Sequence, residues 1–332
     1  MILEFRPYKD FNFITTFAKK FHIPSTETCL VIPRELGEGS IRKIDLSQEL
    51  IILIHQYRLN EDLILKRLAP ENKIDRVTML FYRSMFPGDT YFSTTQKAVF
   101  QGPRLNHSTI EISSNDLNSI VKFPADSNIH FTVVGISSRL LHIYFHNVQE
   151  NNIVKNVIDG IHHSFLYHER MWPQIEKVLE HLTLINLNEP LAKFYFKLKV
   201  EELLYHLFDK LLKREGIPQK HINNEDVIKM HAIKNEIVKD FAKPPVLSEL
   251  ASLYSFSQTK MKSLFKQIYG DTIFNHFQKA RMDEAAFLLR NSNMTVSQIG
   301  YRLGFSNLSH FSRLFAKHYQ QSPKKFSITG HD

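Results

Sequence analysis

The chain is organised around Ser248-Glu-Leu-Ala-Ser-Leu-Tyr254, which is followed by Ser255-Phe256-Ser257 and by a longer segment from Gln258 to Tyr269. The same arrangement returns as Ser297-Gln-Ile-Gly-Tyr-Arg-Leu303, Gly304-Phe305-Ser306 and a segment from Asn307 to Tyr319. The copies are offset by 49 residues up to Ser257 and Ser306 and by 50 from Met261 and Phe311, so the second turn holds one extra residue. A short helix, a tight turn and a longer helix, present twice, are typical of a DNA-binding domain.

Each longer segment is expected to be a helix with one apolar face and one polar face. The apolar side chains recur at helical spacing, and hydroxyl and cationic side chains occupy the other side. The apolar stripes are Met261, Leu264, Phe265 and Ile268 in the first copy, and Phe311, Leu314, Phe315 and His318 in the second. Ser257 and Ser306 stand where an N-cap hydroxyl is expected. An ordinary solvated helix has a similar composition, but the repetition favours DNA binding.

Three motifs near the C-terminus carry a family resemblance. They are Gly304-Phe305-Ser306-Asn307-Leu308-Ser309-His310-Phe311-Ser312-Arg313-Leu314-Phe315, then Ser322-Pro323-Lys324-Lys325-Phe326, and Arg281-Met282-Asp283-Glu284-Ala285 with Leu288-Leu289. Together they resemble the DNA-binding domain of the AraC/XylS family of bacterial transcription regulators, over about the last 100 of 332 residues. One departure is Gln320, where the second copy usually carries a glycine, as Gly270 does in the first. A side chain there makes a left-handed helix end less favourable.

The helix register and the family's base-contacting positions together indicate the DNA contacts. Arg313 is the best candidate for a bidentate contact with guanine. A connecting helix from Thr272 to about Asn291 would be roughly 30 Å long, close to the about 34 Å of one DNA turn. Both copies are therefore expected to contact the same duplex. The expected base contacts are Thr259, Lys262, Ser263, Ser309, His310, Ser312 and Arg313, and the expected phosphate contacts are Lys260, Lys266 and Lys317.

Composition agrees with a soluble protein of two or three domains. Of the 332 residues 43% are hydrophobic and 23% are charged, and Cys29 is the single cysteine. No run of eighteen apolar residues and no signal peptide are present, so we expect a cytoplasmic protein with no membrane contact. Residues 241–332 contain 12 Lys and Arg against 5 Asp and Glu, so this segment accounts for +7 of the formal charge of +8. A basic segment behind a nearly neutral one is expected when only one end meets phosphate.

The N-terminal part has the pattern of a β-rich domain. Short apolar or alternating runs are separated by turn-forming residues, which predicts an antiparallel sandwich or small barrel. The runs are Leu50–Ile54, Leu63–Leu68, Val77–Tyr82, Lys97–Phe100, Thr109–Ser113 and His130–Ile136. Residues 1–44 are less clear, although Tyr8–Phe21 has the pattern of a short amphipathic helix capped by Asp10. The resemblance implies that this domain is cupin-like and senses an effector.

No catalytic or cofactor site is indicated by the sequence. His55, His107, His130, His142 and His146 are scattered, and the i, i+4 pair of His142 and His146 lacks a glutamate that would complete a metal site. His162, His163 and His168 are interpreted as part of a solvated helix face. No phosphate-binding glycine loop and no nucleophile elbow is present. We therefore expect neither enzymatic activity, nor a metal, nor a cofactor.

After Val148 the chain is expected to be helical. Asn188 to Glu215 is the most regular part, with apolar residues at helical spacing. Such a helix either packs on the sheet of its own domain or pairs with its copy in a second subunit, and the two options are compatible. A linker then leads to a helix from about Glu225 to Phe241, capped by Asn224 and ended by a proline pair.

The resulting fold class is α+β, in three parts. Residues 1–148 form a β-rich effector-sensing domain, residues 149–222 a helical dimerisation or linker segment, and residues 223–332 an all-α DNA-binding domain with helix-turn-helix units at 248–269 and 297–319. The resemblance implies a transcriptional activator that works as a homodimer with RNA polymerase. Phe194–Leu204 and Lys260–Phe274 look most like the siderophore-responsive branch, which implies an iron chelate as the small-molecule effector.

Two alternatives remain at this point. In the first, the regulator has no small ligand and its N-terminal domain serves only dimerisation or partner binding. A thermal-shift screen with metabolites distinguishes this alternative, because a ligand selective for the native state stabilises it. In the second, the protein is a DNA-binding enzyme such as a repair protein, which would need Cys29 as a reactive thiol. Loss of activity in a Cys29→Ser variant would support that reading.

Overall fold

The computed structural model describes residues 1–72, 74–83, 91–92, 108–160, 162–214 and 220–328. The described residues form two compact units. The N-terminal unit runs to Val227 and includes Gln267–Gly270, and the C-terminal unit comprises Ile228–Lys266 and the chain from Asp271 onward. Among the described residues, no helix is both long and apolar enough to span a bilayer.

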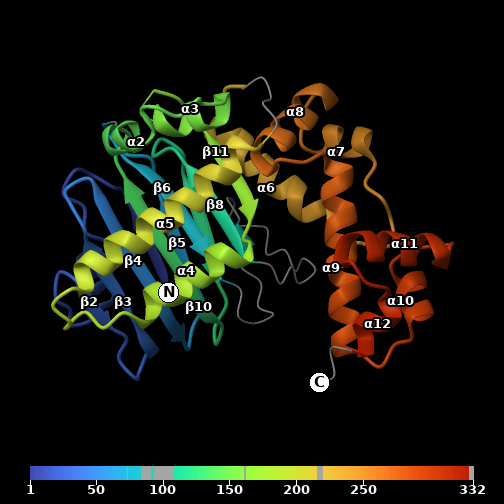
Figure 1. The fold of residues 1–332 in the computed structure, drawn as a ribbon, viewed down its shortest axis with the longest axis horizontal. Coiled ribbons are helices and arrows are strands. Elements are labelled where there is room, and N and C mark those ends of the chain that lie inside the picture. The colour runs from blue at the N-terminus through green and yellow to red at the C-terminus, as the bar shows by residue number, and fades with distance from the viewer. Residues whose placement is uncertain (73, 84–90, 93–107, 161, 215–219, 329–332) are drawn as a thin grey trace. The chain divides into compact units, whose positions relative to one another are not determined.

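The N-terminal unit contains two β-sheets (Figure 1). The seven-stranded sheet has the order β11-β8-β6-β10-β4-β3-β2, and all its neighbouring strands are antiparallel. Its strands are β2 Cys29–Val31, β3 Gly37–Asp45, β4 Leu50–Leu59, β6 Val77–Tyr82, β8 Thr109–Ser113, β10 Asn128–Ile136 and β11 Leu166–Arg170. The second sheet has the order β1-β5-β9-β7, with β1 Ile2–Phe5 parallel to β5 Leu63–Arg67 and the remaining pairs, β9 Ser119–Phe123 and β7 Tyr91–Phe92, antiparallel.

Helices cover one face of the seven-stranded sheet. They are α2 Ser138–Phe145, α3 Asn152–Ile158, α4 Pro173–Leu184 and α5 Ala192–Leu212, and Figure 1 shows α5 crossing the sheet. The core between them includes Ile52, Met79 and Val134 from the strands, and Phe196 and Leu207 from α5. All five of these side chains are fully buried. The Asn188–Glu215 segment therefore packs on the sheet of its own domain, which is one of the two arrangements expected for it.

The opposite face of the same sheet packs on the four-stranded sheet and on α1 (Phe13–Phe21). Strand β4 shows why both faces are covered. Its even-numbered Ile52 and Ile54 face the helices, and its odd-numbered Tyr57 and Leu59 belong to the second core. Side chains alternate between the two faces of a strand, so a strand covered on both sides is apolar almost continuously.

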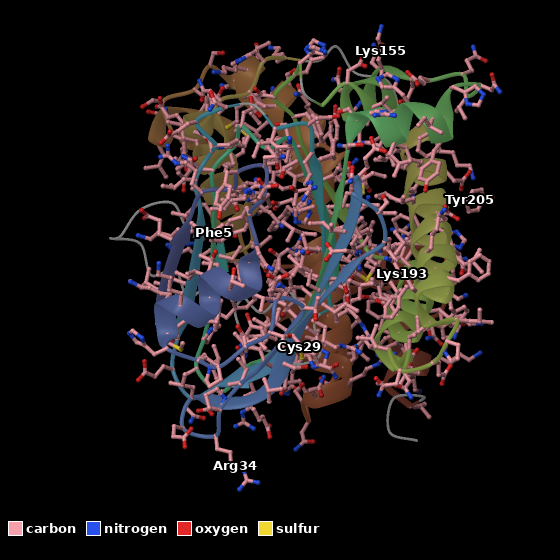
Figure 2. The ribbon with its side chains drawn as sticks, turned by 90° about the vertical axis from the view of Figure 1, so that its left-hand side faces the viewer. Phe5, Cys29, Arg34, Lys155, Lys193 and Tyr205 are labelled. Carbon is pink, nitrogen blue, oxygen red and sulfur yellow. The ribbon has the colours of Figure 1, made fainter. Side chains whose placement is uncertain are left out.

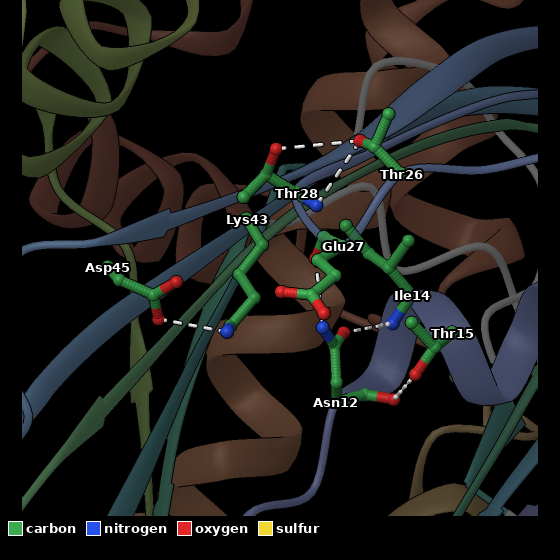
Figure 3. A network of polar contacts seen from close by, with 8 residues as sticks. All are labelled: Asn12, Ile14, Thr15, Thr26, Glu27, Thr28, Lys43 and Asp45. Atoms are coloured by element: carbon green, nitrogen blue, oxygen red, sulfur yellow. Dashed lines mark hydrogen bonds and ion pairs between the residues drawn. The ribbon is translucent and has the colours of Figure 1, made fainter.

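Helix α1 is fastened at its N-terminus by Asn12 (Figure 3). The Asn12 carboxamide oxygen accepts from the Ile14 amide at 2.9 Å, and its nitrogen donates to the Glu27 carbonyl at 2.9 Å. The expected cap, Asp10, is wrong because the helix begins at Phe13, two residues later than a cap at Asp10 would place it. An asparagine reaches both the first helical turn and the following loop, so it serves the N-cap and joins two segments.

Most predicted strands are confirmed, but β1, β2, β3, β7 and β9 were not predicted, and the chain after Val148 is not entirely helical. The predicted runs at 50–54, 63–68, 77–82, 109–113 and 130–136 all become strands, with small differences at their ends. Lys97–Phe100 and His107 lie outside the described residues. The expectation of continuous helix is wrong at β11, which pairs with β8. His168 is therefore a buried strand residue, 6% exposed, rather than part of a solvated helix face.

The C-terminal unit is helical. Helix α6 ends at Ile237, four residues before the expected Phe241, because Asp240 accepts from the Ala242 amide at 2.8 Å and forms a turn. Its cap is Asn223, which accepts from the Asp226 amide at 2.8 Å, and not the expected Asn224. The helices are α6 Asn224–Ile237, α7 Leu247–Leu253, α8 Gln258–Tyr269, α9 Ile273–Asn291, α10 Val296–Arg302, α11 Leu308–Tyr319 and α12 Pro323–Ile328.

The two helix-turn-helix turns share a left-handed residue. Ser255 has a φ of 55° and Gly304, its counterpart 49 residues on, has a φ of 78°. The following amides make matching hydrogen bonds, from Phe256 to the Ala251 carbonyl at 2.9 Å and from Phe305 to the Gly300 carbonyl at 3.0 Å. A Cβ on Gly304 would lie 2.3 Å from the Ala242 carbonyl oxygen. The second turn therefore requires glycine for its backbone conformation and for space.

We predict that Gly304→Ala destabilises the C-terminal unit by at least about 2 kcal/mol, because left-handed backbone strain adds to the clash with Ala242. Trp172 is the only tryptophan and lies in the N-terminal unit. Unfolding of the full chain by urea should show an earlier far-UV circular dichroism transition, while the Trp172 fluorescence transition stays in place. Ser255→Gly is the matched control and should be neutral or stabilising by up to about 1 kcal/mol. If the circular dichroism transition of Gly304→Ala fell at the same urea concentration as that of the parent chain, the requirement for glycine at this turn would be contradicted.

Candidate nucleic-acid interface

Helix α8 buries one side and leaves the other open. Ser257 is its N-cap, as predicted, and accepts from the Lys260 amide at 3.2 Å. All four residues of the predicted apolar stripe, Met261, Leu264, Phe265 and Ile268, are fully buried. Burial of such side chains contributes roughly 1.5–3 kcal/mol each, so the stripe fixes the rotation of the helix about its axis. That rotation determines which side chains face outward.

Helix α11 has the same design with a different cap. Asn307 accepts from the His310 amide at 3.1 Å, so the expected cap Ser306 is wrong. The reason is the extra residue in the second turn, which moves the start of the helix by one position. Phe311 and Phe315 are fully buried. Leu314 and His318, the other two members of the predicted stripe, are half-buried.

All ten side chains predicted to contact DNA lie on α8 or α11, away from the buried stripes. The exposed ones are Thr259, Lys262, Ser309, His310, Arg313 and Lys317, and the half-buried ones are Lys260, Ser263, Lys266 and Ser312. Each helix therefore presents a row of hydroxyl and cationic groups, which suits base edges and phosphates. The individual roles of these side chains are predictions.

Two cations have local contacts that bear on these rows. Arg313 donates from Nε to the Ser309 carbonyl of its own helix at 3.4 Å, and its terminal nitrogens take no part in that bond. Lys260 and Lys229 both lie over the Phe256 ring, at 5.3 and 5.4 Å from its centroid. Lys229 comes from α6 and was missed from the sequence. It stands 27 residues before Phe256, and no local pattern links the two.

Helix α9 supports the second helix-turn-helix unit through the side chain of Arg281. The guanidinium lies 3.7 Å from the Phe305 ring centroid and donates from Nε to the Leu303 carbonyl at 2.6 Å. Burial lowers the pKa of Arg281, but an arginine remains charged at neutral pH. Leu303 and Phe305 flank the turn between α10 and α11. Arg281 therefore holds that turn in place from a neighbouring helix.

A second support is Asp283, which is 8% exposed on α9. It accepts from the Tyr319 hydroxyl at 2.7 Å and lies 3.2 Å from His318 Nε2. Both partners belong to the last turn of α11, and Gln320 then ends that helix with a φ of 58°. The left-handed helix end expected at this position is therefore present without glycine. With 19 residues, α9 is about 28 Å long and connects the two helix-turn-helix units (Figure 1).

Comparison with known protein families gives a match for residues 250–327, under the description "Helix-turn-helix domain". Its relatives are regulators of the AraC type, so the resemblance deduced from the motifs is confirmed. This is an AraC-type DNA-binding domain. The match covers less than half of the chain and leaves the β-rich unit outside it.

Two curated relatives of this AraC-type domain are transcriptional activators. One is the HTH-type transcriptional activator RhaS of Salmonella schwarzengrund (strain CVM19633), 29% identical over 123 residues that make up 37% of this chain and 44% of the relative. The other is the transcriptional activator AggR of Escherichia coli, 35% identical over 95 residues, or 28% of this chain and 35% of the relative. The alignments thus span less than half of either relative. Both are named as regulators and not as enzymes, in agreement with the interpretation of the sequence.

Similar solved structures include the C-terminal domain of AraT, a response regulator from Geobacillus stearothermophilus. It is 25% identical with a TM-score of 0.29, and the match covers 30% of this chain and 84% of that chain. ToxT from Vibrio cholerae is 16% identical with a TM-score of 0.30, and the match covers 84% of this chain and 98% of that chain.

We predict that Tyr319→Phe destabilises the C-terminal unit by about 1–3 kcal/mol, because it removes a hydroxyl donor from a buried carboxylate. The measurement is the circular dichroism transition of the full chain in urea. Tyr301→Phe removes a hydroxyl from an α10 side chain that is 60% exposed, and should change stability by less than about 0.5 kcal/mol. If the two variants behaved alike, Asp283 would not be holding the end of α11.

Proposed function

We propose that this chain is a sequence-specific DNA-binding transcription regulator whose α8 and α11 enter successive major grooves of one duplex. The observation that carries the proposal is the pair of helices that bury matching apolar stripes and expose rows of hydroxyl and cationic groups. The about 28 Å length of α9 supports it, because major grooves on one face of DNA recur about every 34 Å.

The exposed groups would divide into two roles. Arg313 would make a bidentate contact with guanine, and Thr259, Lys262, Ser263, Ser309, His310 and Ser312 would contact other base edges. Lys260, Lys266 and Lys317 would contact phosphates, which gives affinity without sequence information. The net formal charge of +7 on residues 241–332 supports the phosphate contacts. Because RhaS and AggR are named as activators, we further propose that this chain activates transcription in the cytoplasm with RNA polymerase as a partner.

We also propose that the protein is a homodimer that pairs through the outer face of α5. This helix is apolar on two opposite sides, one of which is buried on the sheet. On the other side Leu191, Phe194 and Leu198 are 72%, 60% and 45% exposed, and Tyr205 is 65% exposed. Figure 2 shows Tyr205 extending from α5 away from the sheet. Leu184 and Leu187, just before the helix, are 75% and 46% exposed.

The size of this α5 face argues for a second copy of the chain as its partner. With Tyr195 it exposes several hundred Å² of apolar surface, which is of the order of the about 800 Å² that each partner buries in a standard interface. Monomeric proteins rarely expose so large a patch. Its flanking charges are paired within the helix, Lys199 with Glu202 at 2.6 Å and Lys197 with Glu201 at 4.0 Å. A face that is apolar along its centre and internally neutralised can pair with itself about a two-fold axis.

The β-rich unit is proposed to sense a small-molecule effector. The alternative, a unit that serves only dimerisation or partner binding, would use the α5 face without any ligand in the sheets. The iron-chelate interpretation rests on two short stretches of sequence and stays a prediction. The position of Cys29 does not support the enzyme alternative. Cys29 lies in β2 of the N-terminal unit and not in the helix-turn-helix domain.

Selection of DNA from a random pool by the full chain tests the main proposal. We expect a motif of two blocks about one helical turn apart. Arg313→Ala should lose about 1–3 kcal/mol of discrimination at one base pair of that motif. Lys317→Ala should weaken binding to all DNA sequences alike. It should also reduce the salt dependence of binding by the amount that about one phosphate contact contributes. A uniform loss in Arg313→Ala would overturn its role in specificity, and binding with no enriched sequence would overturn the proposal itself.

A second prediction concerns the α5 face. Leu191→Glu combined with Phe194→Glu should convert a dimer into a monomer in sedimentation velocity, because four charges would be placed in a closed symmetric interface. The fold should persist, since both side chains are exposed in the single chain. Tyr8→Glu, at a 63% exposed tyrosine elsewhere in the N-terminal unit, should leave the assembly unchanged. A parent chain that sediments as a monomer, or a double variant that still dimerises, would rule out this interface.

A further inference from the structure

The two recognition helices are built alike, but their last turns differ. Gln267 of α8 corresponds to Lys317 of α11, and Tyr269 corresponds to Tyr319. Lys317 is exposed, and the Tyr319 hydroxyl donates to a carboxylate of α9, within the C-terminal unit. Gln267 is only 2% exposed, and the end of α8, Gln267–Gly270, is part of the N-terminal unit. Helix α8 therefore passes from the C-terminal unit into the N-terminal unit at its last turn.

Three hydrogen bonds hold this last turn. The Gln267 side chain accepts at Oε1 from the Lys220 amide at 2.9 Å, and it donates from Nε2 to the Lys220 carbonyl at 2.9 Å. The Gln267 carbonyl accepts from Arg214 Nη2 at 2.7 Å. The last carbonyls of a helix have no partner within the helix, so Arg214 supplies a donor that α8 itself lacks. We call Arg214, Lys220 and Gln267 the α8 attachment.

Arg214 joins the α8 attachment to strand β11. Its Nη1 donates to Glu169 Oε1 at 3.1 Å, and the two side chains are 8% and 14% exposed. The guanidinium also lies 5.3 Å from the centroid of the Tyr167 ring. Burial lowers the pKa of Arg214 while Glu169 favours its charged form, and an arginine remains a cation at neutral pH. Because breaking a buried ion pair leaves one charge uncompensated, Arg214 is held firmly on β11.

Tyr269 and Gly270 fit closely beside the α8 attachment. The Tyr269 ring is 7% exposed and meets the His168 ring of β11 edge-on, at 5.5 Å between centroids. Gly270 has a φ of 71°, and a Cβ there would lie 3.1 Å from both Nε and Nη2 of Arg214. Gln320, at the corresponding position of α11, is also left-handed but carries a side chain. Glycine is therefore required after α8 for the approach of Arg214, and not for the helix end alone.

We propose that the α8 attachment lets the N-terminal unit orient the first recognition helix for DNA, while α11 depends on the C-terminal unit alone; this rests on the proposed DNA-binding function. Helix-turn-helix proteins contact bases with the N-terminal residues of the recognition helix. Thr259, Lys262 and Ser263 lie in the first two turns of α8, so an attachment at the last turn leaves them clear. A helix held in its bound orientation loses less freedom on binding and therefore binds more tightly.

The consequence is an asymmetric response of the DNA site. A rearrangement of β11 would act, through Glu169 and Arg214, on the block of bases that α8 contacts. The block that α11 contacts would not respond, because Tyr319 at the end of that helix is bonded inside the C-terminal unit. Control by the N-terminal unit is therefore expected at one half of the DNA site only.

Binding of the full chain to two DNA duplexes tests the inference. One duplex carries the two-block motif selected by the parent chain, and the other has the α8 block scrambled. The change in selection caused by Arg313→Ala identifies the α11 block, so the remaining block belongs to α8. Arg214→Gln and Gln267→Met should each weaken binding to the intact motif about 5–10-fold, because each removes hydrogen bonds of the attachment. On the scrambled duplex both variants should bind like the parent.

Two controls distinguish orientation of α8 from general damage. Methionine is close to glutamine in size and helix propensity, so α8 should still form in Gln267→Met, and Trp172 fluorescence checks that the N-terminal unit of each variant is folded. Arg58→Gln removes an ion pair of the N-terminal unit, with Asp126 at 3.1 Å, in which no residue of α8 takes part. This control variant should bind both duplexes like the parent.

The double variant, Arg214→Gln with Gln267→Met, shows whether the two residues act as one attachment. Its binding to the intact motif should be at most about 2-fold weaker than that of either single variant, because the first substitution already releases the end of α8. Losses that multiply, or equal losses on the two duplexes, would overturn the inference. Tighter binding by the single variants would also overturn it, since the attachment would then restrain α8.

The behaviour of the parent chain separates this inference from the proposed function. A parent chain that selects no DNA sequence would overturn the regulator, and the inference with it. A parent chain that selects the two-block motif, with Arg214→Gln and Gln267→Met equal to it on both duplexes, would leave the regulator standing and overturn only the role of the α8 attachment.

Discussion

Burial of one apolar stripe on each recognition helix is the constraint on which the DNA-binding end depends. Phe311 contacts Phe305 and Phe315, and Phe315 in turn packs edge-on against Phe326 of α12. The stripe cannot rotate into solvent without exposing these rings, so the outward row of Ser309, Ser312 and Arg313 is set by packing on the opposite side. Helix propensity alone would form α11 but would not decide which side chains it presents.

The same argument explains why much of this end could be predicted from the sequence. A stripe at helical spacing defines the buried face, and the exposed face follows as its complement, so all ten expected contact residues fall on the outer sides of α8 and α11. The caps were harder to predict. Ser306 and Asn307 are both good N-cap residues, and the choice between them depends on the extra residue in the second turn. Contacts between distant segments, such as Lys229 over Phe256, had no local signal at all.

The β-rich unit shows which strands the hydrophobic pattern of the sequence can predict and which it cannot. The strands predicted from alternating or continuous apolar character are five to ten residues long, namely β4, β5, β6, β8 and β10. Strands β1, β2, β3, β7 and β9 were not predicted. Strand β11 was missed because Leu166–Arg170 contains polar and charged residues among helical neighbours. Only its pairing with β8, more than fifty residues earlier in the chain, makes it a strand. His168 is buried for the same reason, and its neighbours in sequence give no indication of it.

Helix α5 and the stacked rings of His55 and Phe131 lie on opposite faces of the same sheet, and this limits how an effector could act on a dimer. Strands β4 and β10 carry Ile54 and Val134 toward the helices, and Phe131, with the His55 ring stacked on it, toward the opposite face. An effector on the side of His55 and Phe131 would therefore not touch α5, and it could shift an equilibrium only if it bound two arrangements of these strands with different affinity. A tightly packed helical core transmits such a change as a rigid layer. The outer face of α5 would then move as a unit, and the pairing of two copies would respond without any ligand contact in the interface.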